Sequence, residues 1–479
     1  MGGLFFKIMQ TNILNTDTIC AIATPHGMGA IAVIRISGPE AMSIVSQLFT
    51  QNGMPFDLEK MVSHKAYYGH IVDNNDLLDE VLVAFFKAPH SFTGEDSAEI
   101  SVHGSVYVQQ KLLQVLIAHG CRMAEAGEFT RRAFINRKFD LAQAEAIADL
   151  ISSESEAAHR VAINQLKGGF SKELQIMRSK LLEMTSLIEL ELDFSEEDVE
   201  FADRSQLKAL LQETLSQVDR LKDSFRLGNA IKNGIPVAIV GQTNTGKSTL
   251  LNALLGEDRA IVSDIAGTTR DTIEETLNIN GILYRFIDTA GLRNTDETIE
   301  KIGIERSYRK INEASVVIGM LDATNDYVSV LSAANDIRSK VDLGHQQLIL
   351  CINKVDTLDD QGEALLGELR LDLDNDAILV ICLSAKHGFG LNDLYSTLKH
   401  SQPVASPDAT LVTNVRHYEA LLHASESLNQ VQQGLEMDIP TDLISQDLRQ
   451  ALFYLGSITG EITTDEVLGT IFSRFCIGK

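Results

Sequence analysis

The sequence predicts a multidomain protein: an α+β N-terminal domain, an α-helical domain that is discontinuous in the sequence, and an inserted α/β domain. Its 479 residues correspond to about three domains of roughly 150 residues each. Short apolar runs separated by turn residues fill residues 17–120, whereas residues 233–398 alternate strands and helices in a βαβ rhythm. Helical patterning lies on both sides of that second region.

The N-terminal part is predicted to be a compact α+β domain. Its strands are expected at the β-branched runs Ile31–Ile36, Val81–Phe86 and Ala98–Val102. Helical patterns occupy residues 39–49 and 106–118 between those runs.

From Asp140 to about residue 227 the sequence is rich in Ala, Leu, Glu and Gln, which predicts helices. One long helix carries an apolar stripe with a 3-4-3-4 spacing, formed by Leu174, Met177, Leu181, Met184 and Ile188. A stripe of this kind is expected in a core rather than at a ligand site. The acidic segment 191–200 is expected to be a solvated loop or helix start rather than a metal site.

Residues 401–408 contain two prolines and are predicted to be a linker, after which helical patterning is expected to hold to the last residue. Thr463–Glu466 is typical of a capping box at the start of the final helix. The expected domains are 1–136, 137–231, 232–399 and 400–479, with the second and fourth forming one helical domain. Whether these two flanks meet is left open.

The net charge and the cysteine content indicate which classes of function this protein can have. With 41 Lys+Arg against 66 Asp+Glu the net charge is −25, which argues against broad nucleic-acid binding, so any such contact needs a local basic patch. The five cysteines are scattered without zinc-ligand spacing, which favours a reducing cytoplasm. No signal segment or apolar run of ~18 residues is expected. The end Cys476–Lys479 fits a lipidation motif poorly, and nothing indicates that Cys476 is reactive.

A phosphate-binding loop is the first motif that carries chemistry. Val237–Val240 is a short strand-like run, Gly241–Ser248 has the pattern G-x-x-x-x-G-K-S, and an apolar helical stretch follows. The glycines let backbone N–H groups surround phosphates at a helix N-terminus, where anions are favoured. Lys247 is expected to reach the β- and γ-phosphates, and the Ser248 hydroxyl to bind Mg²⁺.

Four further elements follow in order, and together they indicate guanine specificity. Gly267–Thr269 supplies a hydroxyl for Mg²⁺, and Asp288–Gly291 follows an apolar strand. Asn353–Asp356 ends in a carboxylate that can accept the N1 and N2 protons of guanine, and the backbone of Ser384–Lys386 can meet O6. Asn280-Gly281 is a hairpin signal between two strand-like runs. The GTP-binding residues expected from these motifs are Thr245, Gly246, Lys247, Ser248, Thr249, Gly267, Thr268, Thr269, Asp288, Thr289, Ala290, Gly291, Asn353, Lys354, Asp356, Ser384, Ala385 and Lys386.

This segment resembles the TrmE–Era–EngA–septin-like branch of GTPases. Ras-like enzymes place a water-orienting Gln after the second switch glycine, but here that position is Leu292, which cannot orient water. Glu297, Glu300 and Glu305 are therefore alternative sources of the catalytic group. Asn244 either faces the phosphates or simply forms a turn.

Almost the whole chain resembles the MnmE (TrmE) family of tRNA modification GTPases. The motifs that carry the resemblance are Asp17–Ile19, Ala30–Gly38, Ser91–Asp96, Gly127–Thr130, Lys138–Leu150 and Phe475–Lys479. The resemblance implies a folate-binding N-terminal domain, a split helical domain and an inserted G domain. It also implies a cytoplasmic homodimer that works with the FAD-dependent protein MnmG in a heterotetramer. The pair adds an aminomethyl or carboxymethylaminomethyl group to carbon 5 of the wobble uridine of certain tRNAs.

The resemblance also implies the ligands of each cofactor. It extends the expected GTP-binding residues to Asn244, Ser263, Asp264, Ile265 and Ala266. The K⁺ ligands would be Asn244, Ser263, Ile265 and Thr268, the Mg²⁺ ligands Ser248 and Thr269, and the catalytic carboxylate Glu300. The one-carbon donor would be 5-formyltetrahydrofolate or a related tetrahydrofolate, bound by Arg35, Glu99, Lys138 and Lys479. Cations suit the glutamate tail of a folate and a carboxylate suits its pterin N–H groups, although surface charges would also explain these residues.

Two departures from the family pattern and one basic cluster leave questions open. Met28 stands where the family usually has Arg, and Ser105 where a second Gly is usual. The basic cluster consists of Arg122, Arg131, Arg132, Arg137 and Lys138. It could bind the folate tail, bind tRNA phosphates, or pair with acidic neighbours such as Glu125 and Glu128. A rival function is an Era-like switch GTPase in ribosome assembly, which would need no folate site.

Overall fold

The computed structural model describes residues 17–193, 204–258, 275–279, 281–287, 311–358, 360–373, 378–400, 410–437, 439–462, 465–473, 475 and 478. The chain divides into two compact units. Unit 1 comprises Met1–Ala148, Leu166–Arg178 and Leu452–Lys479, and unit 2 comprises Asp149–Gln165 and Ser179–Ala451. The predicted domain boundaries at residues 136, 231 and 399 stay a prediction.

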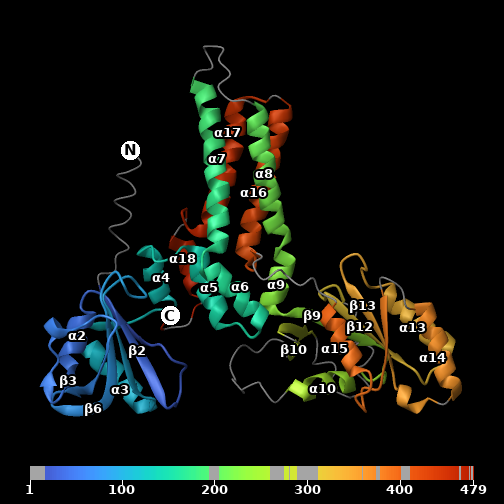
Figure 1. The fold of residues 1–479 in the computed structure, drawn as a ribbon, viewed down its shortest axis with the longest axis horizontal. Helices are drawn as coiled ribbons and strands as arrows, with labels where there is room; N and C mark the ends of the chain where they lie inside the picture. The colour runs from blue at the N-terminus through green and yellow to red at the C-terminus, as the bar shows by residue number, and fades with distance from the viewer. Residues whose placement is uncertain are drawn as a thin grey trace. The chain divides into compact units, whose positions relative to one another are not determined.

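Within its described residues, unit 1 contains a mixed sheet with the order β4-β3-β5-β6-β7-β2-β1-β8 (Figure 1, blue). The strands are β1 Thr18–Ile22, β2 Ile31–Ser37, β3 Phe49–Gln51, β4 Met54–Pro55, β5 Ala66–Asp73, β6 Asp76–Phe86, β7 Ser97–His103 and β8 Cys121–Met123. The helical segments are α2 Ala41–Leu48, the 3-10 turn Leu58–Lys60, α3 Val106–Ala118, α4 Glu128–Ile135, α5 Leu141–Ile151 and α18 Asp465–Phe472. The α+β prediction is therefore confirmed, and the predicted strands and helices lie in β2, β6, β7, α2 and α3.

The two faces of this sheet have different partners. Ala32, Ile34 and Ile36 alternate along β2 and join one core with α2 and α3. Arg35, between them, lies on the opposite face, where Ile19 of β1 packs against Phe129 of α4. The face that carries Arg35 is thus covered by α4.

The helical elements confirm the predicted apolar stripe. They are α6 Glu156–Leu166, α7 Gly169–Asp193, α8 Arg204–Asp223, α9 Phe225–Asn233, α16 Val415–Glu436 and α17 Thr441–Thr459. Every residue of the stripe in α7 is at most 1% exposed, so these side chains form core. The acidic segment after Asp193 lies outside the described residues.

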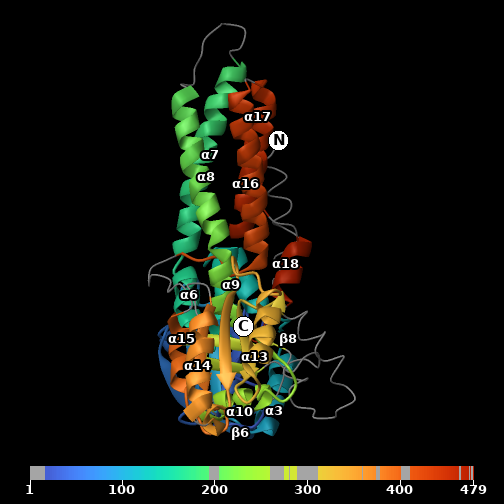
Figure 2. The same ribbon diagram turned by 90° about the vertical axis from the view of Figure 1, so that its right-hand side faces the viewer.

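The two flanks of the inserted segment meet, which settles the question that the sequence left open. In Figures 1 and 2, α8 runs beside α16. Ser425 Oγ of α16 donates to Asp219 Oδ1 of α8 at 2.8 Å. The N–H of Val412 donates to Ser224 Oγ at 3.1 Å, which holds the returning chain against the start of α9.

The inserted segment has the predicted α/β architecture, with the strand order β10-β11-β9-β12-β13-β14. Its strands are β9 Ile235–Gly241, β10 Glu275–Ile279, β11 Ile282–Phe286, β12 Val316–Asp322, β13 Gln347–Asn353 and β14 Ile378–Leu383. All neighbours are parallel except β10 and β11, which form the predicted hairpin. The helical segments are α10 Lys247–Asp258, α13 Tyr327–Arg338, the 3-10 turn Val355–Thr357, α14 Asp360–Leu373 and α15 Leu391–His400. Helices α10 and α15 cover one face, and α13 and α14 cover the other.

One prediction about the chain end is wrong. The last helix, α18, ends at Phe472, and the later described residues Phe475 and Gly478 are not helical. Gly478 has φ +95°, and a Cβ there would lie 2.1 Å from the Ile22 carbonyl oxygen, so the chain leaves the helix to lie against β1. The predicted linker 401–408 and residues Thr463 and Thr464 of the capping box lie outside the described residues. No helix in the described ranges is long and apolar enough to cross a membrane.

Candidate functional sites

The phosphate loop has the backbone that its glycines predict. It leaves β9 at Gly241, with φ +148°, passes Asn244, with φ +59°, and enters α10 after Gly246, with φ +95°. A Cβ at Gly241 would lie 2.4 Å from the Met320 carbonyl oxygen, so the loop requires glycine there. Lys247 Nζ donates to the carbonyl oxygens of Gly241 and Gln242 at 3.0 and 2.7 Å. The ammonium group therefore lies over the loop, at a helix N-terminus that favours anions.

The segments expected to bind guanine follow two adjacent parallel strands, β13 and β14. Asn353, at the end of β13, donates from Nδ2 to the Thr245 carbonyl oxygen at 2.8 Å. Its Oδ1 accepts from the N–H of Ala385 at 2.9 Å. One buried side chain thus joins the phosphate loop to both base-recognition segments.

The surroundings of Asp356 favour the ionised form of its carboxyl group, which can accept hydrogen bonds. A hydrogen bond from Ser384 is the largest cause that lowers the pKa of its carboxyl group, and the electrostatic influence of the nearby His387 and Lys386 lowers it further. His387 Nε2 lies 3.5 Å from Asp356 Oδ2. The neighbouring Lys354, with φ +69°, pairs through Nζ with Asp322 Oδ2 at 2.5 Å. An ionised carboxylate is the acceptor that the two guanine N–H groups require.

About half of the expected nucleotide residues can be located. Residues 244–249, 353, 354, 356 and 384–386 are described, and they lie around the phosphate loop and the two base-recognition segments. The positive φ of Asn244 fits its interpretation as a turn-forming residue. The others lie outside the described residues: Ser263, Asp264, Ile265, Ala266, Gly267, Thr268, Thr269, Asp288, Thr289, Ala290, Gly291 and Glu300, together with Leu292, Glu297 and Glu305.

The expected Mg²⁺ site can be examined only at Ser248, because its other expected ligand, Thr269, is not described. Ser248 is in the first turn of α10, directly after the phosphate-loop lysine. Its hydroxyl is a hard oxygen donor of the kind that Mg²⁺ prefers. Among the described residues, no group of three His, Cys, Asp or Glu side chains could hold a metal ion.

A second site lies in unit 1, where Arg35 and Glu99 are direct partners across β2 and β7. Arg35 Nε and Nη2 each lie 2.9 Å from Glu99 Oε1. The guanidinium lies 4.9 Å from the ring centre of Phe92 and 5.8 Å from that of Phe129. Its Nη1 donates to the Gly478 carbonyl oxygen at 3.5 Å. Arg35 is thus a partly buried, paired group beside two aromatic rings and not a plain surface charge.

Lys138 lies near the same place. Its Nζ donates to the Pro89 carbonyl oxygen at 2.8 Å. The ring of the next residue, Phe139, lies 6.0 Å from that of Phe92. The fourth expected folate residue, Lys479, lies outside the described residues.

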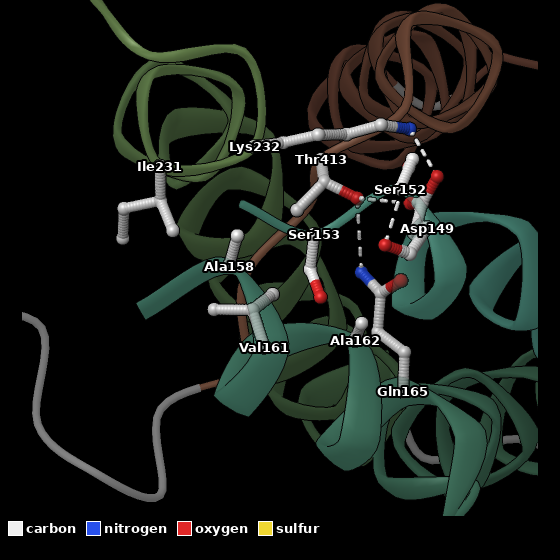
Figure 3. Close-up of a pocket in the computed structure, with 10 residues that line it drawn as sticks. All are labelled: Asp149, Ser152, Ser153, Ala158, Val161, Ala162, Gln165, Ile231, Lys232 and Thr413. Carbon is white, nitrogen blue, oxygen red and sulfur yellow. Dashed lines mark hydrogen bonds and ion pairs between the residues drawn. The ribbon is translucent and has the colours of Figure 1, made fainter. Parts of the chain in front are cut away.

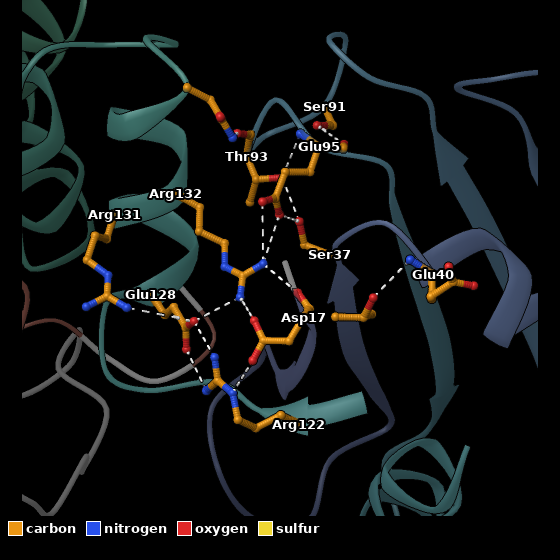
Figure 4. A network of polar contacts seen from close by, with 12 residues as sticks. Asp17, Ser37, Glu40, Ser91, Thr93, Glu95, Arg122, Glu128, Arg131 and Arg132 are labelled. Carbon is orange, nitrogen blue, oxygen red and sulfur yellow. Dashed lines mark hydrogen bonds and ion pairs between the residues drawn. The ribbon is translucent and has the colours of Figure 1, made fainter. Parts of the chain in front are cut away.

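Three of the five residues in the basic cluster pair with carboxylates, as one of the three interpretations predicts. Arg122 and Arg132 both contact Asp17 and Glu128, and Arg131 lies 3.9 Å from Glu128 (Figure 4). Arg132 also reaches Glu95, and Arg131 reaches Glu125. The sequence anticipated Glu125 and Glu128 but missed Asp17 and Glu95. Arg137 and Lys138 are exposed and lie outside this network.

Residue 28, where the family usually has arginine, is a methionine with an exposed side chain. Met28 is 88% exposed, so it does not bury its side chain in place of the usual arginine. The adjacent Gly29 donates its N–H to the Gly104 carbonyl oxygen at 3.0 Å. A Cβ at Gly104 would lie 2.2 Å from the Gly29 carbonyl oxygen, so this close approach of two chain segments requires glycine at residue 104.

A pocket in unit 2 is lined by residues of α6 and α9 and by Thr413, among others (Figure 3). Its polar groups bind one another: Lys232 Nζ lies 2.7 Å from Asp149 Oδ1, and Gln165 Nε2 lies 3.3 Å from Thr413 Oγ1. These contacts join the chain segments that enter and leave the inserted domain. The polar lining of this pocket therefore has a structural explanation.

Comparison with known proteins identifies the family. A family profile described as "GTP-binding protein TrmE N-terminus" matches residues 18–138, and one described as "MnmE helical domain" matches residues 141–476. The "tRNA modification GTPase MnmE" of Bacteroides fragilis is 51% identical over 469 residues, covering 97% of this chain and all of that protein. The protein of the same name from Flavobacterium johnsoniae is 52% identical over 472 residues, covering 98% and 100%.

Among solved structures, a crystal structure of Era from Aquifex aeolicus bound to GDP and AlF4⁻ is 27% identical. It covers 40% of this chain and 66% of that one, with a TM-score of 0.27. The chain belongs to the MnmE (TrmE) family of tRNA modification GTPases.

Proposed function

We propose that this protein hydrolyses GTP and acts in tRNA modification. The observation that carries the proposal is the contact of Asn353 with both Thr245 and Ala385, since it assembles a phosphate loop and a guanine-recognition segment in one site. The full-length likeness to MnmE proteins supports tRNA as the substrate.

The reaction that we propose is the addition of an aminomethyl or carboxymethylaminomethyl group to carbon 5 of the wobble uridine, with a flavoprotein partner, MnmG. A tetrahydrofolate would supply the one-carbon unit on the sheet face that carries Arg35 and Glu99. The paired Arg35 and Glu99 offer a cation and a carboxylate beside two aromatic rings, which suits a folate with its acidic tail and flat pterin. Lys138 and Lys479 are the further proposed folate contacts. A homodimer in the cytoplasm, where tRNA and GTP are found, is part of the same proposal.

The residues of this chain have separate proposed roles at the GTP site. Lys247 and the loop amides hold the phosphates, and Asp356 holds the guanine base. Ser248 and Thr269 would hold Mg²⁺, while Asn244, Ser263, Ile265 and Thr268 would hold K⁺. These cations would neutralise charge that develops on the phosphates during hydrolysis. Glu300 is the proposed catalytic carboxylate that orients the attacking water.

The GTPase proposal is tested by hydrolysis in potassium and in sodium at equal ionic strength. Faster turnover in potassium is expected, and equal rates would contradict the K⁺ site. Glu300→Ala should keep nucleotide affinity and lose turnover. If turnover persists in this variant, Glu300 has no catalytic role.

The folate proposal is tested by calorimetry of the full chain with 5-formyltetrahydrofolate. Saturable binding that Glu99→Gln weakens is expected. If the full chain does not bind, the Era-like alternative of a switch GTPase in ribosome assembly is favoured, because such a protein needs no folate site.

A further inference from the structure

The network of charged side chains in unit 1 joins three segments that are far apart in the sequence (Figure 4). Asp17 precedes β1, Thr93 and Glu95 belong to the segment between β6 and β7, and Glu128 and Arg132 lie on α4. We refer to these five residues and Arg122, Arg131 and Ser37 as the unit 1 polar network. All of its contacts lie on the sheet face that also carries Arg35.

Glu128 is the centre of this network. Its side chain is fully buried, and its two oxygens accept from Arg122 Nη2 at 2.7 Å, Arg122 Nη1 at 3.1 Å and Arg132 Nη2 at 3.0 Å. The backbone N–H of Glu125 adds a fourth hydrogen bond at 2.8 Å. A buried carboxylate with this many donors has one well-defined position, because any movement leaves charged groups without partners.

Arg132 extends the network from α4 to the other two segments. Its Nη1 donates to the Asp17 carbonyl oxygen at 2.9 Å and lies 3.3 Å from Glu95 Oε2. Ser37 Oγ of β2 donates to the same Glu95 oxygen at 2.7 Å and shares a 2.7 Å hydrogen bond with Thr93 Oγ1. The segment that contains Thr93 and Glu95 is therefore fixed to both α4 and the sheet.

Two members of the network are the immediate sequence neighbours of the rings that flank Arg35. Phe92 precedes Thr93, and Phe129 follows Glu128. Their ring centres lie 4.9 and 5.8 Å from the Arg35 guanidinium carbon. The network therefore fixes the chain directly next to both rings, and both rings lie beside Arg35.

We propose that Glu128 and Arg132 are positioning residues that hold Phe92 and Phe129 around Arg35 and so keep the Arg35–Glu99 face ready for its ligand. This inference rests on the proposed folate function for the identity of that ligand. Neither Glu128 nor Arg132 touches the ligand in this account. Both act through the aromatic rings.

The first test is Glu128→Gln in the full-length protein, measured by calorimetry with 5-formyltetrahydrofolate and separately with GDP. The amide has nearly the same volume but no charge, so folate affinity should fall at least about tenfold, as expected when charged hydrogen bonds are lost. GDP affinity should not change. Glu128→Asp, which keeps the charge, should restore part of the folate affinity.

The matched control is Asp79→Asn in the same domain. Asp79 accepts from the N–H of His103 at 2.8 Å and pairs with its ring at 2.7 Å. Asp79 lies two and four residues before Val81 and Val83 on β6, so it belongs to the same face of the sheet as these two core residues. That face is opposite the one that carries Arg35. If Asp79→Asn and Glu128→Gln weaken folate binding equally, the network only stabilises the domain and the inference is overturned.

A second readout needs no ligand. The chain contains no tryptophan, so Phe139→Trp provides a single fluorescent reporter at a position whose native ring lies 6.0 Å from Phe92. Adding Glu128→Gln should shift the emission to longer wavelength and raise quenching by iodide, whereas adding Asp79→Asn should not. An unchanged reporter spectrum contradicts the inference.

This reporter separates the two proposals. If the parent protein does not bind 5-formyltetrahydrofolate but the reporter responds to Glu128→Gln, the folate assignment fails and the positioning role stands. If Glu128→Gln does not fold, Glu95→Gln is the substitute, because Glu95 is only partly buried and contacts Arg132 at 3.3 Å. The same tenfold loss and reporter shift are then expected, and their absence overturns the inference.

Discussion

Asn353 Nδ2 donates to the carbonyl oxygen of Thr245 at 2.8 Å, so a side chain at the end of β13 holds the loop that follows β9. The two residues are separated by more than 100 positions in the sequence. The loop expected to hold the phosphates and the segments expected to hold the base are therefore joined directly by one side chain.

Asn353→Ala should weaken GTP and GDP binding by roughly 10- to 100-fold, because it leaves the Ala385 N–H and the Thr245 carbonyl without their shared partner, at about 1–3 kcal/mol. Fluorescent-nucleotide titration measures this. Unaltered affinity would show that the loops keep their places without Asn353.

Gly246→Ala should disrupt the same contact from the other side. A Cβ at this residue would lie 2.2 Å from Asn353 Nδ2, and its φ of +95° is disfavoured for alanine. We expect a loss of about 1–3 kcal/mol in the free energy of unfolding and weaker GDP binding.

The matched control for that glycine is Gly367→Ala in α14. No heavy atom lies within 4 Å of the added Cβ there, so the change should raise helix stability by about 0.5–1 kcal/mol and leave GDP affinity alone. Thermal unfolding with and without GDP distinguishes the two variants. If the two variants had the same unfolding temperatures and the same response to GDP, a clash of the added Cβ at residue 246 would not explain the loss of stability.

Asp356→Asn should change base specificity from guanine to xanthine. The carboxylate accepts two N–H groups, whereas the amide can donate to the oxygen that xanthine carries at position 2. Loss of the charged hydrogen bonds to the base predicts at least a roughly 100-fold fall in GDP affinity. Competition between GDP and XDP measures the exchange, and a variant that still prefers GDP would exclude Asp356 from base recognition.

The unit 1 polar network should make stability depend on pH in the acid range. Hydrogen bonding from Arg122 is the main cause that lowers the pKa of Asp17. Burial alone would raise the pKa of Glu128, but hydrogen bonds from Arg122, Glu125 N–H and Arg132 outweigh it and lower the pKa.

Because both folded-state pKa values lie below the unfolded ones, the carboxylates contribute stability fully above about pH 4–4.5 and lose it as the pH falls further. Thermal unfolding midpoints between pH 7 and pH 3 should decline below pH 4.5, and Glu128→Gln should flatten the decline. A variant as acid-sensitive as the parent protein would show that other carboxylates control the transition.

The features that the sequence predicts best are those specified by a single contiguous segment. The phosphate loop is a contiguous motif with glycines at the positions where positive φ is required, so its strand, loop and helix could be placed in advance. The helix α3 and the stripe of α7 likewise follow from a period that one segment displays by itself.

Partners from distant segments could not be predicted in the same way. Asp17 and Glu95 lie 115 and 37 positions from Arg132, and no local pattern distinguishes them from solvated carboxylates. The resemblance implies that Arg35 and Glu99 belong to one folate site, but it does not predict that they pair with each other, because this pairing depends on the register of β2 and β7. The departure of the chain end from helix after Phe472 depends on the Ile22 backbone, which is equally remote.

The pairing of α8 with α16 has a consequence for how the chain is made. Roughly 190 residues separate the end of α8 from the start of α16. At about 5–20 residues per second, the ribosome needs on the order of 10–40 s to synthesise that interval. Until α16 emerges, the residues of α8 that pack against it lack that partner, so the helical domain can be completed only after the whole inserted domain has been synthesised.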